Sequence, residues 1–126
     1  MMSPRRVLVV DDEPEVRELL HDFLSSRGYE VVLVEGGLDA LAALDAARPD
    51  VILLDVAMPG MDWVETLRRI VARVAPPPVI MVTANADVGV TSRLLALGAA
   101  DYIPKPFDLD YLDQAVSIQV AGEQRG

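Results

Sequence analysis

The sequence predicts an α/β fold, a doubly wound parallel sheet of five strands with five helices packed on its two faces. Short apolar runs rich in β-branched residues recur along the chain, as expected for strands buried on both faces. Amphipathic stretches at helical spacing separate these runs, and prolines and glycines stand at the boundaries. Five strand–helix units in succession favour a parallel sheet joined by right-handed crossovers.

The first half of the chain contains three expected strands and two expected helices. Pro14 suits the first turn of a helix, and Arg27-Gly28 ends that helix. The next helix is rich in alanine and stops at Arg48-Pro49. We expect strands at 7–10, 30–34 and 51–54, and helices at 14–27 and 39–47.

The second half repeats the scheme after a turn at Met58-Pro59-Gly60. Leu67, Ile70, Val71 and Val74 share one face of an expected helix, which three consecutive prolines close. Gly98 caps the following helix. We expect helices at 62–74, 87–97 and 108–120, and strands at 79–82 and 100–103.

Length, composition and charge bear on the number of domains, the location of the protein and its binding to nucleic acid. The 126 residues suit one domain with a core at about 6–121, and we expect no output domain in this chain. No apolar run approaches the ~20 residues that span a membrane, and there is no cysteine, so we expect a cytoplasmic protein. The net charge of −9 argues against direct binding of nucleic acid.

Chemically active side chains collect where the expected strands end, which is where such sheets bind ligands. Asp11, Asp12 and Glu13 follow the first strand, and Asp55 ends the third. Thr83 ends the fourth strand, and Lys105, the only lysine, follows the fifth. Carboxylates ~5 Å apart repel by roughly 3 kcal/mol at an effective dielectric constant near 20, which favours a bound cation.

An all-oxygen site with room for water and phosphate favours Mg²⁺, and Mn²⁺ could replace it. One aspartate is then available as a nucleophile toward phosphorus. The charge on a phosphoryl group in transfer is spread over three oxygens, and Mg²⁺, Lys105 and the Thr83 hydroxyl can stabilise that charge. The residues therefore predict an aspartyl-phosphate site.

Four motifs in order resemble the receiver domain of bacterial response regulators over essentially the whole chain. They are Val-Val-Asp-Asp-Glu at 9–13, Leu-Leu-Asp-Val-Ala-Met-Pro-Gly-Met-Asp at 53–62, Val-Thr-Ala at 82–84, and Gly-Ala-Ala-Asp-Tyr-Ile-Pro-Lys-Pro-Phe at 98–107. The resemblance implies a flavodoxin-like three-layer fold with strand order 2-1-3-4-5. It also implies two-component signal transduction rather than a conventional enzyme, with Mg²⁺-dependent self-phosphorylation from phosphodonors and self-dephosphorylation.

The same resemblance implies roles for single residues. Asp55 would accept the phosphoryl group from a histidine kinase or a phosphotransfer protein. Asp12 would bind Mg²⁺ directly, Asp11 mainly through water, and the backbone carbonyl of Ala57 would be a further ligand beside Asp55. Lys105 would pair with the phosphoryl group.

Two further roles concern switching and output. Thr83 and Tyr102 would move on phosphorylation and change a protein-interaction surface at about 87–120. That surface would contact a downstream protein or a separate output domain, or form a phosphorylation-dependent homodimer. Pro106 would hold the lysine's loop, as in many members through a cis bond.

The sequence departs from the family pattern at Trp63, where glycine is usual. Two alternatives stay open at this point. A pseudo-receiver would use the same fold as a pure binding module, but such modules usually lose an acidic ligand, the acceptor or the lysine. A haloacid-dehalogenase-like phosphatase would need a second aspartate two positions after the nucleophile, where this chain has Ala57.

Overall fold

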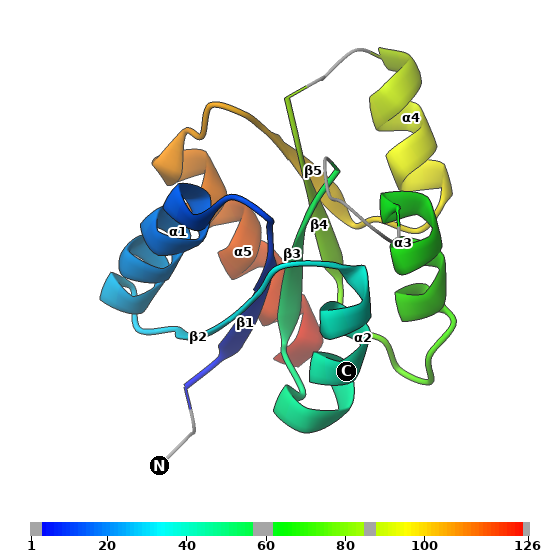
Figure 1. Cartoon of the computed structure of the whole chain (residues 1–126). Coiled ribbons are helices and arrows are strands. Elements are labelled where there is room, and N and C mark those ends of the chain that lie inside the picture. Colours follow the sequence, from blue (N-terminus) through cyan, green and yellow to red (C-terminus); the bar gives the residue numbers. More distant parts are fainter. Residues whose placement is uncertain (1–3, 57–61, 85–87, 125–126) are drawn as a thin grey trace.

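The computed structural model describes residues 4–56, 62–84 and 88–124, with side chains as far as residue 121. Its centre is a five-stranded parallel sheet in the order β2-β1-β3-β4-β5, which confirms the expected order (Figure 1). The strands are β1 (Arg6–Val10), β2 (Glu30–Val34), β3 (Val51–Asp55), β4 (Val79–Thr83) and β5 (Asp101–Pro104). β1, β3 and β4 are almost wholly buried, as their uninterrupted apolar sequences predict, whereas β2 and β5 are edge strands.

Helices cover both faces of the sheet, and Figure 1 shows α1 and α5 on one side and α2, α3 and α4 on the other. The helices are α1 (Pro14–Ser26), α2 (Gly37–Ala47), α3 (Trp63–Val71), α4 (Val88–Ala96) and α5 (Leu109–Gln124). None of the helices in the described ranges combines the length and the apolar character needed to cross a membrane.

Alternation along the strands divides the apolar side chains into two cores. In β1, Val7 and Val9 pack in the core beneath α1 and α5, while Leu8 and Val10 pack in the core beneath α2, α3 and α4. Successive side chains of a strand point to opposite faces, so each central strand contributes to both cores. Two apolar layers thus fix the sheet, and its carboxyl edge remains for polar groups.

The predicted glycine caps are confirmed at the ends of α1 and α4. Gly28 and Gly98 have φ angles of 92° and 112°, a backbone region that glycine enters without steric cost. At Gly98 an added Cβ would also lie 3.1 Å from the side chain of Val71, so α3 and the end of α4 approach closely at this point.

The predicted extent of α3 is wrong at its carboxyl end. The helix stops at Val71, and the Val74 side chain, expected on the apolar face, is 99 % exposed. A residue before proline is disfavoured in the helical region, and Ala75, which precedes Pro76, has a left-handed φ of 50°. The prolines account for the non-helical backbone at Ala75, and the helix has already ended four residues earlier, at Val71.

α5 runs to Gln124, four residues past the expected end at 120, and most other boundaries shift by one or two residues. α2 begins at Gly37 rather than at residue 39, and β5 spans 101–104 rather than 100–103. The predicted turn at 58–60, the Ala57 carbonyl and Asp87 lie outside the described residues. The Lys105–Pro106 peptide bond is cis, as the resemblance implied.

Candidate functional site

Strand order places the polar residues of the carboxyl edge next to one another. β3 lies between β1 and β4, so Asp55 at its end is flanked by Asp11, which follows β1, and by the end of β4. Asp55 is in register with Val82, and Thr83 is in register with Pro104 of β5. The next residue, Lys105, donates its main-chain N–H to the Thr83 carbonyl at 2.8 Å.

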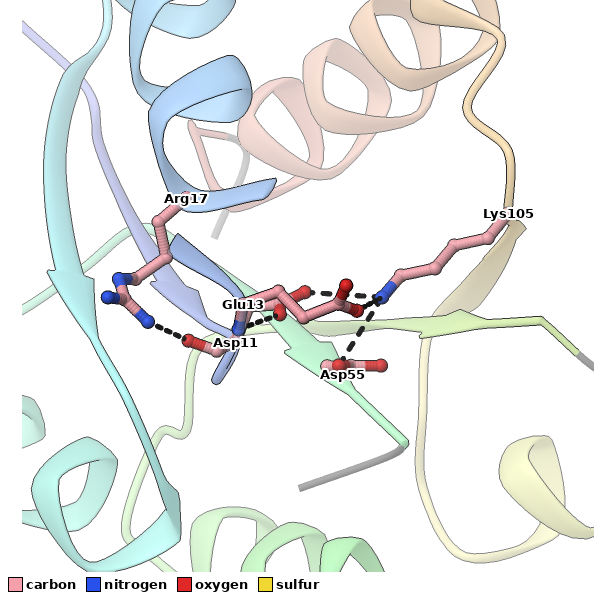
Figure 2. A network of polar contacts seen from close by, with 5 residues as sticks. All are labelled: Asp11, Glu13, Arg17, Asp55 and Lys105. Atoms are coloured by element: carbon pink, nitrogen blue, oxygen red, sulfur yellow. Dashed lines mark hydrogen bonds and ion pairs between the residues drawn. The ribbon is translucent and has the colours of Figure 1, made fainter. Parts of the chain in front are cut away.

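The ammonium of Lys105 stands among three carboxylates, as Figure 2 shows. Its Nζ lies 3.4 Å from Oδ2 of Asp11, 3.3 Å from Oε1 of Glu13 and 3.4 Å from Oδ2 of Asp55. These distances exceed the ~2.8 Å of a tight charge-assisted hydrogen bond, so the ammonium is shared rather than committed to one partner. It can therefore turn toward a new anion without breaking a strong contact.

The charges around Lys105 change its acidity. Burial of the ammonium acts to lower its pKa, and the negative charges of Asp55 and Asp11, with hydrogen bonds to Glu13 and Asp55, act to raise it. The carboxylates together outweigh burial, so the pKa of Lys105 is raised above its ordinary value. The lysine is thus a fixed positive charge at neutral pH.

Asp11 is held at each of its polar groups. Its main-chain N–H donates to the Val34 carbonyl at 3.2 Å, and its own carbonyl accepts from the Arg17 guanidinium at 2.7 Å. Oδ1 of its carboxylate accepts the Glu13 main-chain N–H at 2.9 Å, and Oδ2 faces Lys105. Asp11 is also buried, with 2 % of its surface exposed, so its position in the site is fixed.

Asp12 differs from Asp11 in being exposed. Among the residues that the structure describes, no hydrogen bond or ion pair of the Asp12 carboxylate is found. Asp12 is also not the N-cap of α1, because Glu13 occupies that position and makes no side-chain capping bond. Its carboxylate is therefore available to an added ligand.

Asp11, Asp12, Glu13 and Asp55 form an acidic cluster that fits a cation. Each offers a carboxylate oxygen, and these oxygens lie within 4.8 Å of one another. By formal charge, these four carboxylates exceed the one ammonium of Lys105 by three. All donors are oxygens, which suits a hard divalent cation.

Thr83 and Tyr102, the two expected switch residues, lie on neighbouring strands. Thr83 is 2 % exposed at the end of β4. Tyr102 is half-buried in β5, packs against the core beneath α2, α3 and α4, and is in register with Met81. Its main-chain carbonyl accepts a long 3.5 Å contact from the Tyr111 hydroxyl of α5.

The structure brings together Asp11, Asp12, Asp55 and Lys105, as the strand ends predicted, while their chemical roles stay predictions. Sequence reasoning missed two contacts. It did not place Glu13 against Lys105, and it did not identify Arg17. A signal for Arg17 exists: it stands one helical turn into α1, and helical side chains lean toward the amino end, here toward the acidic turn.

A groove of about 420 Å³ runs beside the cluster, between α1 and the segment that follows β5. Glu13 and Lys105 line its end nearest the cluster, and the apolar Val16, Leu19 and Phe107 line much of the rest. Leu19 is 44 % exposed. The groove gives a partner an apolar surface next to the charged residues.

The chain matches a family model and is similar to curated proteins of the same family. The family model described as response regulator receiver domain matches residues 7–117. The chain is 39 % identical over 116 residues to the regulatory protein AtoC of Escherichia coli (strain K12), covering 92 % of this chain and 25 % of AtoC. It is 42 % identical over 109 residues to the response regulator MprA of Mycobacterium sp. (strain KMS), covering 86 % of this chain and 47 % of MprA.

Among solved structures, the chain is similar to a CheY-like response regulator receiver domain protein from Methanospirillum hungatei JF-1. The TM-score is 0.90 at 27 % sequence identity, and the alignment covers 98 % of this chain and all of the other, at 100 %. The curated relatives are longer proteins, since this chain spans about a quarter of AtoC and about half of MprA.

Proposed function

Because the chain belongs to the response regulator receiver domain family of two-component systems, we propose that it accepts a phosphoryl group on Asp55 and passes the signal to a partner. The observation that carries the proposal is the position of Asp55. Its carboxylate ends a buried central strand, faces the only lysine and lies within the acidic cluster.

The reaction that this site supports is an in-line transfer. A carboxylate oxygen of Asp55 attacks phosphorus while the bond from phosphorus to the donor breaks, giving an acyl phosphate. The leaving group is the imidazole of a phosphohistidine, on a histidine kinase or a phosphotransfer protein, or the carboxylate of a small acyl phosphate. Mg²⁺ would be held by Asp12, Asp55 and, through water, Asp11, and would neutralise charge on the phosphoryl oxygens. The Ala57 carbonyl, a further expected ligand, lies outside the described residues.

Lys105 and Thr83 complete the surroundings of the phosphoryl group. The Lys105 ammonium, shared loosely by Asp11, Glu13 and Asp55, turns to a phosphoryl oxygen when Asp55 is phosphorylated. The Thr83 hydroxyl lies at the end of the adjacent strand and donates to another oxygen.

The phosphodonor has a fitting surface beside the cluster. The groove between α1 and the segment after β5 has Lys105 at its inner end and apolar residues along it. A kinase or phosphotransfer helix that packs on Val16, Leu19 and Phe107 would place its histidine near Asp55. This arrangement supports a protein donor as the partner.

Output would use the surface formed by α4, β5 and α5. When the Thr83 hydroxyl moves toward the phosphoryl group, it leaves space that Tyr102 can enter, and this local change biases a two-state surface. The surface is more apolar than basic, although α4 carries Arg93: α5 has no lysine or arginine and exposes Ile118, while α4 exposes Val88 and Leu95. The partner would be a separate protein, an output domain or a second copy of this chain.

Acetyl phosphate with Mg²⁺ tests the proposal. We expect the intact mass to rise by one phosphoryl group, and we expect Asp55→Asn to stay unmodified because an amide does not attack phosphorus. Asp62→Asn is the matched control, since Asp62 is an exposed cap of α3 and asparagine caps equally well. A pseudo-receiver would show no addition to the wild type, and a phosphatase would hydrolyse the donor continuously without retaining phosphate.

A further inference from the structure

We propose that Arg17 is a positioning residue for the cation site: it holds the Asp11 carbonyl and thereby aims the Asp12 carboxylate at the acidic cluster. The inference rests on the proposed function, because it concerns the cation that Asp12 and Asp55 would share. Arg17 itself touches neither phosphate nor metal in this account. It acts through the backbone between Asp11 and Asp12.

The contacts of Arg17 join the ends of two strands. One arm of its guanidinium donates to the Asp11 carbonyl at 2.7 Å, and the other lies 3.4 Å from Oε1 of Glu35, the residue after β2. The Arg17 side chain is 15 % exposed, whereas that of Glu35 is 74 % exposed. The contact with Asp11 is therefore shorter and more buried than the contact with Glu35. Figure 2 shows Arg17 approaching Asp11 from the side opposite Lys105.

The Asp11 carbonyl decides where Asp12 lies, because the peptide bond is planar. The carbonyl of Asp11 and the N–H and Cα of Asp12 belong to one rigid unit, so fixing the first fixes the others. The Asp11 N–H is already bound to the Val34 carbonyl. Arg17 thus removes the remaining rotation of the peptide that precedes Asp12.

Asp12 depends on this support more than its neighbour does. The Asp11 carboxylate is held by the Glu13 N–H and by Lys105. In the described part of the chain the Asp12 carboxylate has no such contact, so the backbone, which orients its Cα–Cβ bond, is the main restraint on where its rotamers can place it. Release of that backbone therefore affects Asp12 more than Asp11.

The positive charge of Arg17 and its hydrogen bond to the Asp11 carbonyl have opposite effects on metal affinity. A cation near the site repels a divalent metal, so removal of the charge alone would tighten metal binding. Removal of the anchor would weaken binding, because outer contacts that orient ligands typically contribute about 10–100-fold to metal affinity. A rise or a fall of the metal dissociation constant on substitution of Arg17 therefore shows which of the two effects is larger.

The test measures Mn²⁺ affinity by electron paramagnetic resonance of the free ion, with Mg²⁺ added in competition. The proteins are wild type, Arg17→Met and the matched control Arg27→Met. Arg27 lies at the other end of α1, over the Phe23 ring and near Asp113, away from the cluster. We expect the dissociation constant to rise about tenfold in Arg17→Met and to stay unchanged in Arg27→Met.

Equal or tighter Mn²⁺ binding by folded Arg17→Met would overturn the inference. If that variant does not fold, Arg17→Lys decides, because lysine keeps the charge and loses the two-armed grip. Weaker binding by Arg17→Lys supports the inference, and binding equal to wild type overturns it. Wild type that binds no Mn²⁺ displaceable by Mg²⁺ overturns the proposed cation site itself, which is a separate result.

Discussion

The Arg93 guanidinium lies over the ring of Trp63, 5.6 Å from the ring centroid, and joins α4 to the first residue of α3. Trp63 is half-buried against the core beneath α2, α3 and α4, at a position where the family resemblance implies glycine. α3 and α4 follow the strands that end at Asp55 and Thr83. The contact therefore links the helices that follow the two strands ending at Asp55 and Thr83.

Trp63 should report on the proposed phosphorylation site, because it is the only tryptophan in the chain. We expect Mg²⁺ or the phosphate mimic beryllofluoride to change its emission, since both act at the start of the segment that leads to α3. Arg93→Met should alter the starting emission by removing the stacked cation. Unchanged wild-type emission at a saturating concentration of the mimic would show that Trp63 is uncoupled from the site.

Asp12→Ala should have opposite effects on the protein with and without Mg²⁺. Without the ion, the loss of one of four clustered carboxylates relieves repulsion and raises the free energy of unfolding, by up to about 1 kcal/mol for an exposed group. With the ion, the variant gains less stability than wild type because a ligand is missing. Thermal melts with and without Mg²⁺ measure both effects.

The control for this experiment is Asp22→Ala, which removes an exposed acid of α1 outside the cluster. It should leave the stabilisation by Mg²⁺ at the wild-type value. Equal stabilisation of wild type and Asp12→Ala would remove Asp12 from the cation site.

Lys105 should make the free energy of unfolding depend on pH in the alkaline range. Its pKa is raised in the folded state, so its contribution to stability is complete below the ordinary value of 10.5 and is lost as pH rises through the folded pKa. The free energy of unfolding should therefore fall more steeply with pH in wild type than in Lys105→Met over this range. Denaturant unfolding at a series of pH values measures the two slopes. Parallel curves would mean that the carboxylates do not stabilise the ammonium.

Thr83→Ala should separate phosphorylation from response. Asp55 keeps its nucleophile and its cation site, so acetyl phosphate should still modify the variant. Association through the α4, β5 and α5 surface should weaken, because the hydroxyl that responds to the phosphoryl group is absent; a coupling of ~1–3 kcal/mol is enough for a measurable shift. Sedimentation of modified wild type and variant compares them, and salt should have a modest effect on this apolar contact. Equal association of both proteins would exclude this switch.

The sequence predicted the sheet and most of the site because both depend on strong local signals. Uninterrupted apolar runs marked β1, β3 and β4, and strand ends must meet at one edge of a parallel sheet. Asp11, Asp55 and Lys105 could therefore be assigned to one place although the lysine is 94 residues from Asp11 in the chain.

What the sequence did not predict depends on packing between segments or on backbone geometry. The end of α3 was misplaced because the apolar spacing continues to Val74, whereas the helix stops at Val71 and the backbone is left-handed at Ala75. The stacking of Arg93 on Trp63 joins two helices whose relative position no periodicity reports. The position of Arg17 one turn into α1 indicates the direction of its side chain, but its contact ends on a main-chain carbonyl, so no partner side chain identifies that contact in the sequence.

Chemical mapping of the phosphorylated residue tests the central claim most directly. Borohydride reduces an acyl phosphate to an alcohol, so a phosphorylated aspartate becomes homoserine and can be located by peptide mass spectrometry. After treatment with acetyl phosphate and Mg²⁺, we predict homoserine at position 55, dependent on Mg²⁺ and absent without the phosphodonor. Homoserine at position 11, 12 or 62 in place of position 55, or at no aspartate, would contradict the account.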